Sequence, residues 1–241
     1  EKDGTLVFSK NDKHVVELAR NRREDIKGFS YGECDSIIKN GKTSIVFQAN
    51  RYPIQVFGAH NLQNINGARL VCEALGVDSL DFFEAISSFA GTSNRLELIG
   101  KNENTVIYKD FAHSPSKLKA TTSAVKQQFG DSKLVACMEL HTFSSLNKSF
   151  LAQYRGAMDR ADVPIVYFNP EVLVHKKLPM IKLEEIKEAF NNDRLQIFTD
   201  PIKLYNFLVS QSWNKSNLLL MSSGNFGGLN YQDLAKIILK N

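Results

Sequence analysis

The chain has 241 residues and a mass of 27.1 kDa, and its 43% hydrophobic and 23% charged residues exclude disordered, collagen-like and coiled-coil proteins. No apolar run approaches the ~18 residues of a membrane span and no secretory signal opens the sequence, so we expect a cytoplasmic protein that binds no membrane. The net charge of +4 is scattered along the chain and predicts no nucleic-acid partner. Three widely separated cysteines, Cys34, Cys72 and Cys137, predict neither disulfides nor a metal site.

Short strand-like runs dominate the first part of the chain. They cover 5–8, 26–31, 36–47 and 52–58, with one helical stretch over 14–23. The dipeptide Asn40-Gly41 predicts a tight hairpin within the third run. After Gly58 apolar residues recur every three or four positions up to Gly76, which predicts a helix, and a second helix follows over 80–89. A polar stretch at 91–94 then indicates a boundary.

The remaining residues alternate between strands and helices. A hairpin is expected from 95–100 and 105–111, followed by near-continuous apolar strands at 134–140, 165–169, 195–199 and 217–223. Amphipathic helices are expected between and around them, over 115–129, 150–161, 183–190, 201–213 and 231–240. Strands that are apolar on both faces and joined by helices predict a doubly wound, mostly parallel, Rossmann-like α/β domain. Ligands of such sheets bind at the carboxyl ends of the strands.

The segment GKTS at 41–44 resembles the end of a phosphate-binding loop. That loop needs a glycine at position 36, which is Ser36, and a helix after the threonine, where a strand is expected. We therefore interpret the segment as part of the hairpin.

The first turn of the helix after Gly58 carries His60, Asn61 and Asn64. His60 and Asn64 are four residues apart and share one face at the positive end of the helix dipole. An amide side chain offers the donor and the acceptor that an adenine edge needs. N-capping by Asn61 or a neighbour explains the same residues equally well.

The segment 110–117, DFAHSPSK, places Asp110 at the end of a strand, His113 in a turn, and Pro115 at the first position of a helix. Asp110 could accept hydrogen bonds from a ribose while His113 faces a substrate. The alternative is a strand, turn and helix with good local chemistry. Arg95 opens the preceding hairpin. Taken by itself, an arginine in such a place is more often a surface cation than a phosphate ligand.

Two further polar segments follow strand ends. His141, Thr142 and Ser145 lie after the first parallel strand, where a ligand is expected, although any polar loop would look similar. The segment SSGNFGG at 222–228 could hold an anion on its backbone amides, but a plain glycine turn is the better interpretation. No set of acid, base and nucleophile is complete in the chain.

The order of these segments resembles the Mur ligase family. The resemblance rests on G-x-H-N-x-x-N at 58–64, F-x-G-x-x-x-R at 89–95, D-F-A-H-x-P at 110–115 and ELHTFS at 139–144. It is strongest for the branch that contains UDP-N-acetylmuramate:L-alanine ligase and the murein peptide ligase, and it extends over nearly the whole chain. It implies that 1–92 are the latter portion of the central ATP-binding domain and 93–241 the C-terminal domain.

Members of this family make an amide bond with ATP and Mg²⁺. The resemblance implies an acyl phosphate on UDP-N-acetylmuramate, which the amine of an amino acid or peptide then displaces. It places His60, Asn61 and Asn64 at the adenine end of ATP, and Arg95 and Asp110 at phosphate and ribose. It places His113 and His141 near the incoming amine substrate, with Thr142 and Ser145 in the same loop.

Two departures from the family pattern change what we expect. The phosphate loop, the magnesium ligands and the domain that holds the UDP sugar would precede this chain, so the chain alone should lack activity and needs those domains as partners. Where alanine-adding members carry two arginines for the acceptor carboxylate, this chain has Thr142 and Ser145. We therefore expect a peptide acceptor, L-Ala-γ-D-Glu-diamino acid. The alternatives are L-alanine itself, a relative that adds glutamate to folate or polymerises amino acids, and a non-catalytic nucleotide-binding module.

Overall fold

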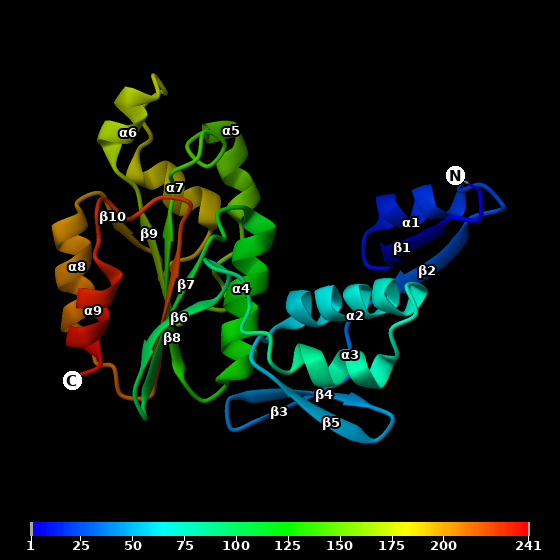
Figure 1. Cartoon of the computed structure of the whole chain (residues 1–241). Coiled ribbons are helices and arrows are strands. Elements are labelled where there is room, and N and C mark those ends of the chain that lie inside the picture. The colour runs from blue at the N-terminus through cyan, green and yellow to red at the C-terminus, as the bar shows by residue number, and fades with distance from the viewer. Residues whose placement is uncertain (1, 241) are drawn as a thin grey trace. The chain divides into compact units, whose positions relative to one another are not determined.

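The computed structural model describes residues 2–240, and its contacts divide the chain into two compact units, Glu1–Ala90 and Gly91–Asn241 (Figure 1). We describe each unit by itself. None of the helices among the described residues combines the length and the apolar character that a membrane span requires.

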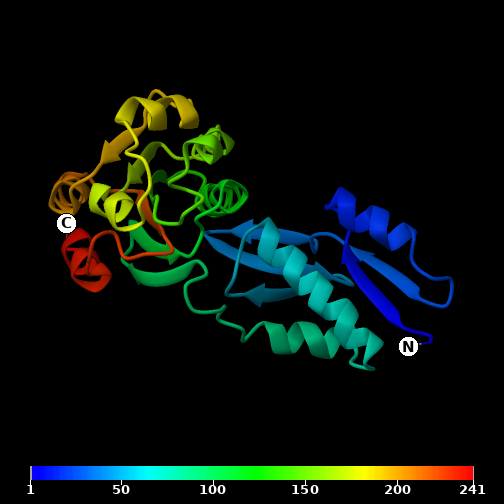
Figure 2. The same ribbon diagram turned by 90° about the horizontal axis from the view of Figure 1, so that it is seen from above.

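The first unit contains a parallel strand pair and an antiparallel sheet. Its elements are β1 (Thr5–Ser9), α1 (Lys13–Arg20), β2 (Lys27–Tyr31), β3 (Ser36–Lys39), β4 (Lys42–Phe47), β5 (Asn50–Ile54), α2 (Ala59–Ala74) and α3 (Ser79–Ile86). Strand β1 pairs in parallel with β2, whereas β3, β4 and β5 form an antiparallel meander. Helices α2 and α3 lie on one face of this meander (Figures 1 and 2). Their shared core consists of Ile45, Ile54, Leu62, Ile65, Phe82 and Phe83.

The hairpin at Asn40-Gly41 is confirmed. Both residues have positive φ, 51° and 68°, as a two-residue turn between twisted strands requires, and β4 follows directly. A strand therefore stands where a phosphate loop would need a helix. A second tight turn joins β4 to β5 through Gln48 and Ala49, whose φ angles are 47° and 66°.

The second unit is the expected α/β domain. Its strands are β6 (Glu97–Lys101), β7 (Thr105–Asp110), β8 (Lys133–Glu139), β9 (Val163–Tyr167), β10 (Gln196–Phe198) and β11 (Ser216–Met221). Its helices are α4 (Pro115–Gln128), α5 (Lys148–Leu151), α6 (Pro170–His175), α7 (Leu183–Phe190), α8 (Pro201–Ser210), α9 (Tyr231–Ile238) and the short 3₁₀-helix η1 (Ala152–Tyr154). The sheet order is β10-β9-β8-β11-β7-β6, and all neighbours are parallel except the edge pair β6 and β7.

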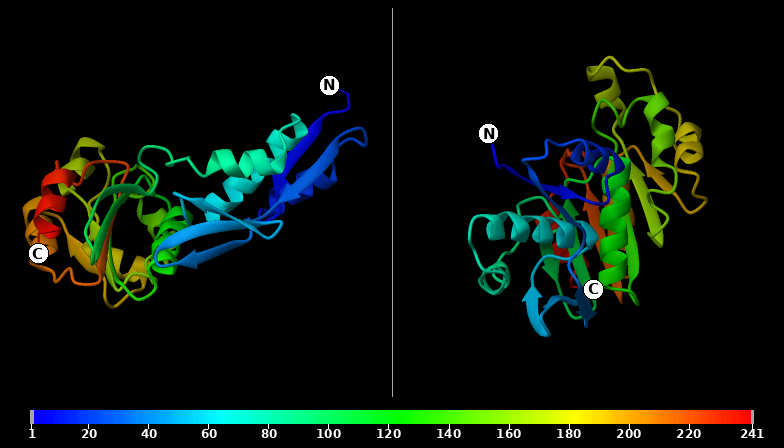
Figure 3. Two further views of the ribbon diagram at one scale, coloured as in Figure 1. Left: turned by 60° about the horizontal axis from the view of Figure 1, so that its bottom comes forward. Right: turned by 90° about the vertical axis from the view of Figure 1, so that its right-hand side faces the viewer.

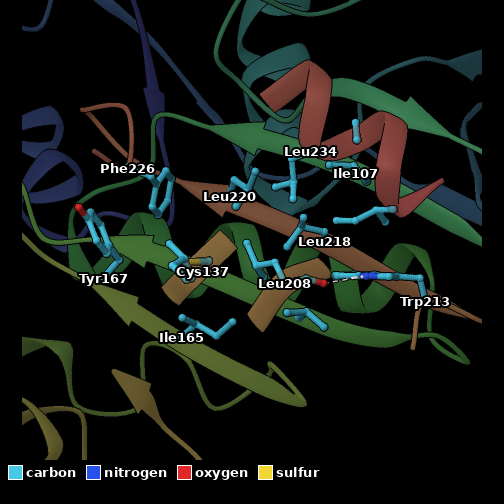
Figure 4. Close-up of a cluster of buried hydrophobic side chains, with 14 residues drawn as sticks. Ile107, Cys137, Ile165, Tyr167, Leu208, Trp213, Leu218, Leu220, Phe226 and Leu234 are labelled. Carbon is cyan, nitrogen blue, oxygen red and sulfur yellow. Dashed lines mark hydrogen bonds between the residues drawn. The ribbon is translucent and has the colours of Figure 1, made fainter. Parts of the chain in front are cut away.

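Helices cover both faces of this sheet. Helices α8 and α9 lie on one face and α4 on the other, which the further views also show (Figures 1 and 3). The central strand β11 is buried along its whole length. Between the sheet and α8 and α9, apolar side chains such as Leu208, Leu218 and Leu234 form the main core, and the indole of Trp213 donates to the Leu208 carbonyl at 3.0 Å (Figure 4).

The helix predicted over 150–161 is wrong. Helix α5 ends at Leu151, one 3₁₀ turn follows, and Gly156 at φ 71° reverses the chain. Tertiary contacts determine this shape, because Tyr154 stacks on Phe190 at 5.1 Å and its hydroxyl donates to the His113 carbonyl at 2.6 Å.

Helix α6 is an addition that we did not predict, although Asn169 caps it and Pro170 opens it.

Core packing against Trp213 gives the first testable expectation. Leu218→Ala removes a fully buried side chain from β11 and should lower the free energy of unfolding by about 2 to 5 kcal/mol. Trp213 is the single tryptophan and lies in the same core, so its fluorescence in urea reports the unfolding of this unit. Leu98→Ala, on the edge strand and 46% exposed, is the matched control and should cost less than about 1 kcal/mol. Equal losses for the two variants would contradict the assigned core.

Candidate functional site at the carboxyl ends of the parallel strands

The polar residues that follow β7, β11 and β8 gather at one edge of the sheet because these strands are parallel neighbours. Asp110 ends β7, Ser222 follows β11, and Glu139 ends β8. This edge carries most of the residues predicted from the sequence to bind a ligand.

Asp110 is a buried carboxylate that fastens a neighbouring loop. It is 7% exposed. Its Oδ2 accepts the Leu96 N–H at 2.7 Å and its Oδ1 accepts the Ala112 N–H at 2.6 Å. Hydrogen bonds to a charged acceptor are stronger than neutral ones, and they compensate for the burial of the carboxylate. Asp110 therefore shapes the site whatever else it binds.

The loop held by Asp110 presents Arg95. The residues on either side of Arg95, Asn94 and Leu96, have positive φ angles of 58° and 44°. Asparagine tolerates this conformation, whereas for leucine it costs conformational energy. Glu97 accepts the Asn94 N–H at 2.8 Å, and the Phe111 N–H donates to the Asn94 carbonyl at 2.8 Å. The Arg95 guanidinium lies 5.7 Å from the Phe111 ring centre. The exposed cation is thus held in a defined place at the edge of the sheet.

A cavity of about 220 Å³ opens beside Asp110. Its polar walls come from three segments, namely the Arg95 loop, the end of β7 and the segment after β11, and the ring of Tyr231 in α9 closes one side. The lining residues are Asn94, Lys109, Asp110, Phe111, Leu220, Ser222, Ser223, Gly224 and Tyr231. Lys109 pairs with Glu97 at 3.2 Å and stands 6.0 Å from the Tyr231 ring centre. The cavity thus offers both charges and an aromatic wall to a small polar ligand.

His113 lies in the turn between β7 and α4. Its Nδ1 is 2.8 Å from the Phe111 carbonyl oxygen, and since a carbonyl only accepts, Nδ1 carries the proton. The ring packs edge-on against Phe111. His113 therefore has a fixed tautomer and is half-buried next to the Arg95 loop.

Glu139 opens the segment ELHTFS at 139–144, but the sequence analysis assigned it no role at the site. The residue is 4% exposed, and its carboxylate accepts the Ser222 hydroxyl and, at 3.0 Å, the Phe226 N–H. Ser222 in turn accepts the Gly224 N–H, and the Ser222 N–H donates to the Asp110 carbonyl. The segment 222–226 is therefore a tied turn, in which the N–H groups of Ser222, Gly224 and Phe226 donate within the protein. The signal in the sequence was a charged residue at the end of an otherwise apolar strand.

His141 and its loop follow β8. The Nδ1 atom of His141 is 3.8 Å from Glu139 Oε1, and its side chain is 36% exposed. Thr142 is half-buried, and its hydroxyl accepts the Ser145 N–H at 3.1 Å. Ser145 is fully buried and its hydroxyl donates to the Thr142 carbonyl. The structure thus places His141 and Thr142 at the accessible edge, while Ser145 holds the loop together from inside.

The negative charge of Glu139 acts on its buried neighbours. Burial, with the negative charge of Glu139 next in size, raises the pKa of the Tyr167 hydroxyl to about 12. The same two causes raise the pKa of the Cys137 thiol well above its usual value, so that this cysteine stays an unreactive thiol.

His60, Asn61 and Asn64 lie in the first unit, at the start of α2. Gly58 is the N-cap residue with φ 91° and makes no side-chain cap. Asn61 donates its amide to the Phe57 carbonyl at 2.8 Å, which ties the helix start to the preceding segment. His60 is half-buried and Asn64 is exposed on the same face. Within residues 2–240, no group of three His, Cys, Asp or Glu side chains could hold a metal ion.

The anchoring role of Asp110 can be tested directly. Asp110→Ala removes both acceptors, and we expect the hydrogen-exchange protection of the Leu96 amide to fall about 10 to 100-fold, as the loss of 1.5 to 3 kcal/mol implies. Trypsin should then cut faster after Arg95. Asp131→Ala, at an exposed position, is the control and should change neither. Unchanged protection in Asp110→Ala would show that other contacts hold the loop.

Comparison with known proteins identifies the family. Residues 94–224 match the family model for the Mur ligase, glutamate ligase domain. The chain is 31% identical over 178 residues, or 68% of its length, to the UDP-N-acetylmuramate–L-alanine ligase of Caldicellulosiruptor bescii. It is 28% identical over 186 residues, or 77% of its length, to the UDP-N-acetylmuramate–L-alanyl-γ-D-glutamyl-meso-2,6-diaminoheptandioate ligase of Haemophilus influenzae. The matched segments make up 38% and 39% of these relatives.

A solved structure agrees on the fold. MurF of Acinetobacter baumannii superposes with a TM-score of 0.70 at 17% identity, and the match covers 99% of this chain and 52% of that one. The matched family model extends over the parallel sheet and the loops at its carboxyl edge. The chain belongs to the Mur ligase family.

Proposed function

We propose that this chain is the C-terminal part of an ATP-dependent, ADP-forming amide ligase of peptidoglycan synthesis or recycling, acting in the cytoplasm. One observation carries the proposal. The family match begins at Asn94 and ends at Gly224, and both residues line the cavity beside Asp110. The segment that defines the family therefore supplies every lining residue of this cavity except Tyr231.

In the proposed reaction, the carboxylate of UDP-N-acetylmuramate attacks the γ-phosphate of ATP, and the incoming amine then displaces phosphate from the acyl phosphate. Arg95 suits a phosphate oxygen because its guanidinium is exposed and held by a fixed loop. Asp110 is proposed for the ribose, in addition to its anchoring of Leu96. In the first unit, the side-chain amide of Asn64 and the side-chain oxygen of Asn61 are proposed to bind the adenine edge, with His60 beside them.

Magnesium would neutralise the phosphate oxygens in such a reaction. The described residues offer no group that could hold it, so we derive no step through the ion. Its ligands, the phosphate loop and the UDP-sugar domain are proposed to belong to other parts of the full-length protein.

The acceptor is proposed to be the peptide L-Ala-γ-D-Glu-diamino acid, with His113, His141 and Thr142 near its amine. The loop after β8 supports this choice because its hydroxyls bond to one another and it presents no guanidinium for a small amino acid's carboxylate. L-Alanine is the second candidate, since several matching relatives carry the name UDP-N-acetylmuramate–L-alanine ligase.

Nucleotide affinity tests the proposed division of the ATP site. The chain has no G-x-x-x-x-G-K-[ST] loop. Calorimetry of the 241-residue chain with Mg-ATP should therefore give a dissociation constant of about 1 mM or higher, which corresponds to a binding free energy of ~4 kcal/mol or less in magnitude. Micromolar binding would contradict the proposal that the phosphate cradle lies elsewhere. If the full-length protein hydrolyses no ATP with any acceptor, that result would favour a non-catalytic binding module.

The choice of acceptor can be tested by introducing an arginine into the loop after β8. In the full-length protein, phosphate release with the tripeptide should exceed that with L-alanine. Thr142→Arg should raise kcat/KM for L-alanine about 10 to 100-fold, because a new ion-paired hydrogen bond contributes about 1.5 to 3 kcal/mol. Phe143→Arg adds the same charge next to it, at a 62% exposed position, and should have little effect. Faster turnover of L-alanine by the unsubstituted protein would overturn the peptide assignment.

A further inference from the structure

We propose that Glu139 is a positioning residue that sets the tautomer of His141, keeping the proton on Nδ1 and leaving Nε2 as a hydrogen-bond acceptor. The tautomer follows from the geometry alone. The use of Nε2 toward the incoming amine rests on the proposed function.

The two oxygens of the Glu139 carboxylate have different tasks. Oε2 accepts both protein donors, the Ser222 hydroxyl and the Phe226 N–H. Oε1 faces His141 Nδ1 at 3.8 Å, which is too long for a direct hydrogen bond but close enough for an electrostatic interaction between the two groups. A carboxylate favours a proton on the ring nitrogen that faces it, so it selects the Nδ1–H form of the neutral ring.

The backbone at Gly224 packs closely against both Glu139 and the imidazole of His141. Gly224 lies against both side chains, and a Cβ at this position would be 2.7 Å from Glu139 Oε2 and 3.0 Å from the Cγ and Nδ1 atoms of His141. A side chain at this position would force the Glu139 carboxylate and the His141 ring to shift. The Ser222 hydroxyl holds Gly224 in turn through the Gly224 N–H at 2.6 Å. Glu139, Gly224 and the ring of His141 therefore form one packed unit.

The opposite ring nitrogen is available for chemistry. Among residues 2–240, the recorded contacts of His141 involve Glu139 and Gly224 on its Nδ1 side, and the side chain is 36% exposed. In the proposed reaction an ammonium group must lose a proton before its nitrogen attacks. That proton would pass to Nε2, the neutral amine would form the C–N bond, the C–O bond to phosphate would break, and the second proton of the amine nitrogen would leave with the departing phosphate. The resulting imidazolium would face the Glu139 carboxylate.

The variant Glu139→Gln tests the proposal sharply because of the division between the two oxygens. The glutamine oxygen must take the Oε2 position to accept from Ser222 and Phe226, which leaves the amide NH₂ facing His141 Nδ1. A donor there requires Nδ1 to be the acceptor. The substitution should therefore keep the shape of the site and invert the tautomer of His141.

The measurement is ¹⁵N NMR of the histidine rings of the 241-residue chain at a pH of about 9, where an imidazole is neutral. We expect the Nδ1–H form for His141 in the unsubstituted chain and the Nε2–H form in Glu139→Gln. His113, whose Nδ1 donates to the Phe111 carbonyl, is the internal reference and should remain Nδ1–H in both. An Nε2–H form of His141 in the unsubstituted chain, or the same form in both proteins, would overturn the proposal.

A second variant and an activity measurement separate the possible failures. Ser222→Ala removes a donor to Oε2 and leaves Oε1 unchanged, so His141 should stay in the Nδ1–H form. If His141 in Ser222→Ala has the Nε2–H form instead, the proposal is overturned, and this holds even if Glu139→Gln fails to fold. In the full-length enzyme, Glu139→Gln should lower kcat on the order of 100-fold with the KM for ATP unchanged. An inverted tautomer with unchanged kcat supports the positioning role and refutes only the proposed contact with the amine.

Discussion

Two buried carboxylates, Asp110 and Glu139, organise the edge of the parallel sheet on which the candidate site depends. Both end a strand, and both lie in places where a charge is costly unless donors surround it. The donors are supplied by loops. Asp110 receives the N–H groups of Leu96 and Ala112, whereas Glu139 receives the Ser222 hydroxyl and the Phe226 N–H. Each loop is thereby held at the sheet by a charge-assisted contact, and the segment after β11 is also held by the burial of the Phe226 ring in the main core.

Ser222 connects the two anchors, since its N–H donates to the Asp110 carbonyl and its hydroxyl to Glu139. The loops after β7, β11 and β8 consequently form one network, and the accessible groups of Arg95, His113 and His141 are presented from a rigid base. Such a base suits the proposed amide ligation, in which reacting groups must be held in contact, because misplacement of about 1 Å can cost on the order of 100-fold in rate. The chain matches less than half of the length of the two relatives compared above.

Much of the architecture followed from local patterns. The Asn40-Gly41 turn, the parallel strands of the second unit and the helices that begin at Pro115 and Pro201 were all predicted, because glycine, proline and unbroken apolar runs act within a few residues. The failures are instructive. The Gln48-Ala49 turn carries no turn-forming residue, and the helix expected over 150–161 is replaced by a bend that Tyr154 holds through Phe190 and the His113 carbonyl.

The sequence by itself determined the class of fold, the family and the list of polar residues at strand ends, since each is written in residues close together along the chain. The tertiary structure alone decided which of those residues do what. Ser145 turned inward to hold its own loop, Asp110 proved to be an anchor, and Glu139 joined the site although its partners lie more than 80 positions away. A carboxylate acquires its role from the donors and the dielectric around it, and those come from segments that only folding brings together.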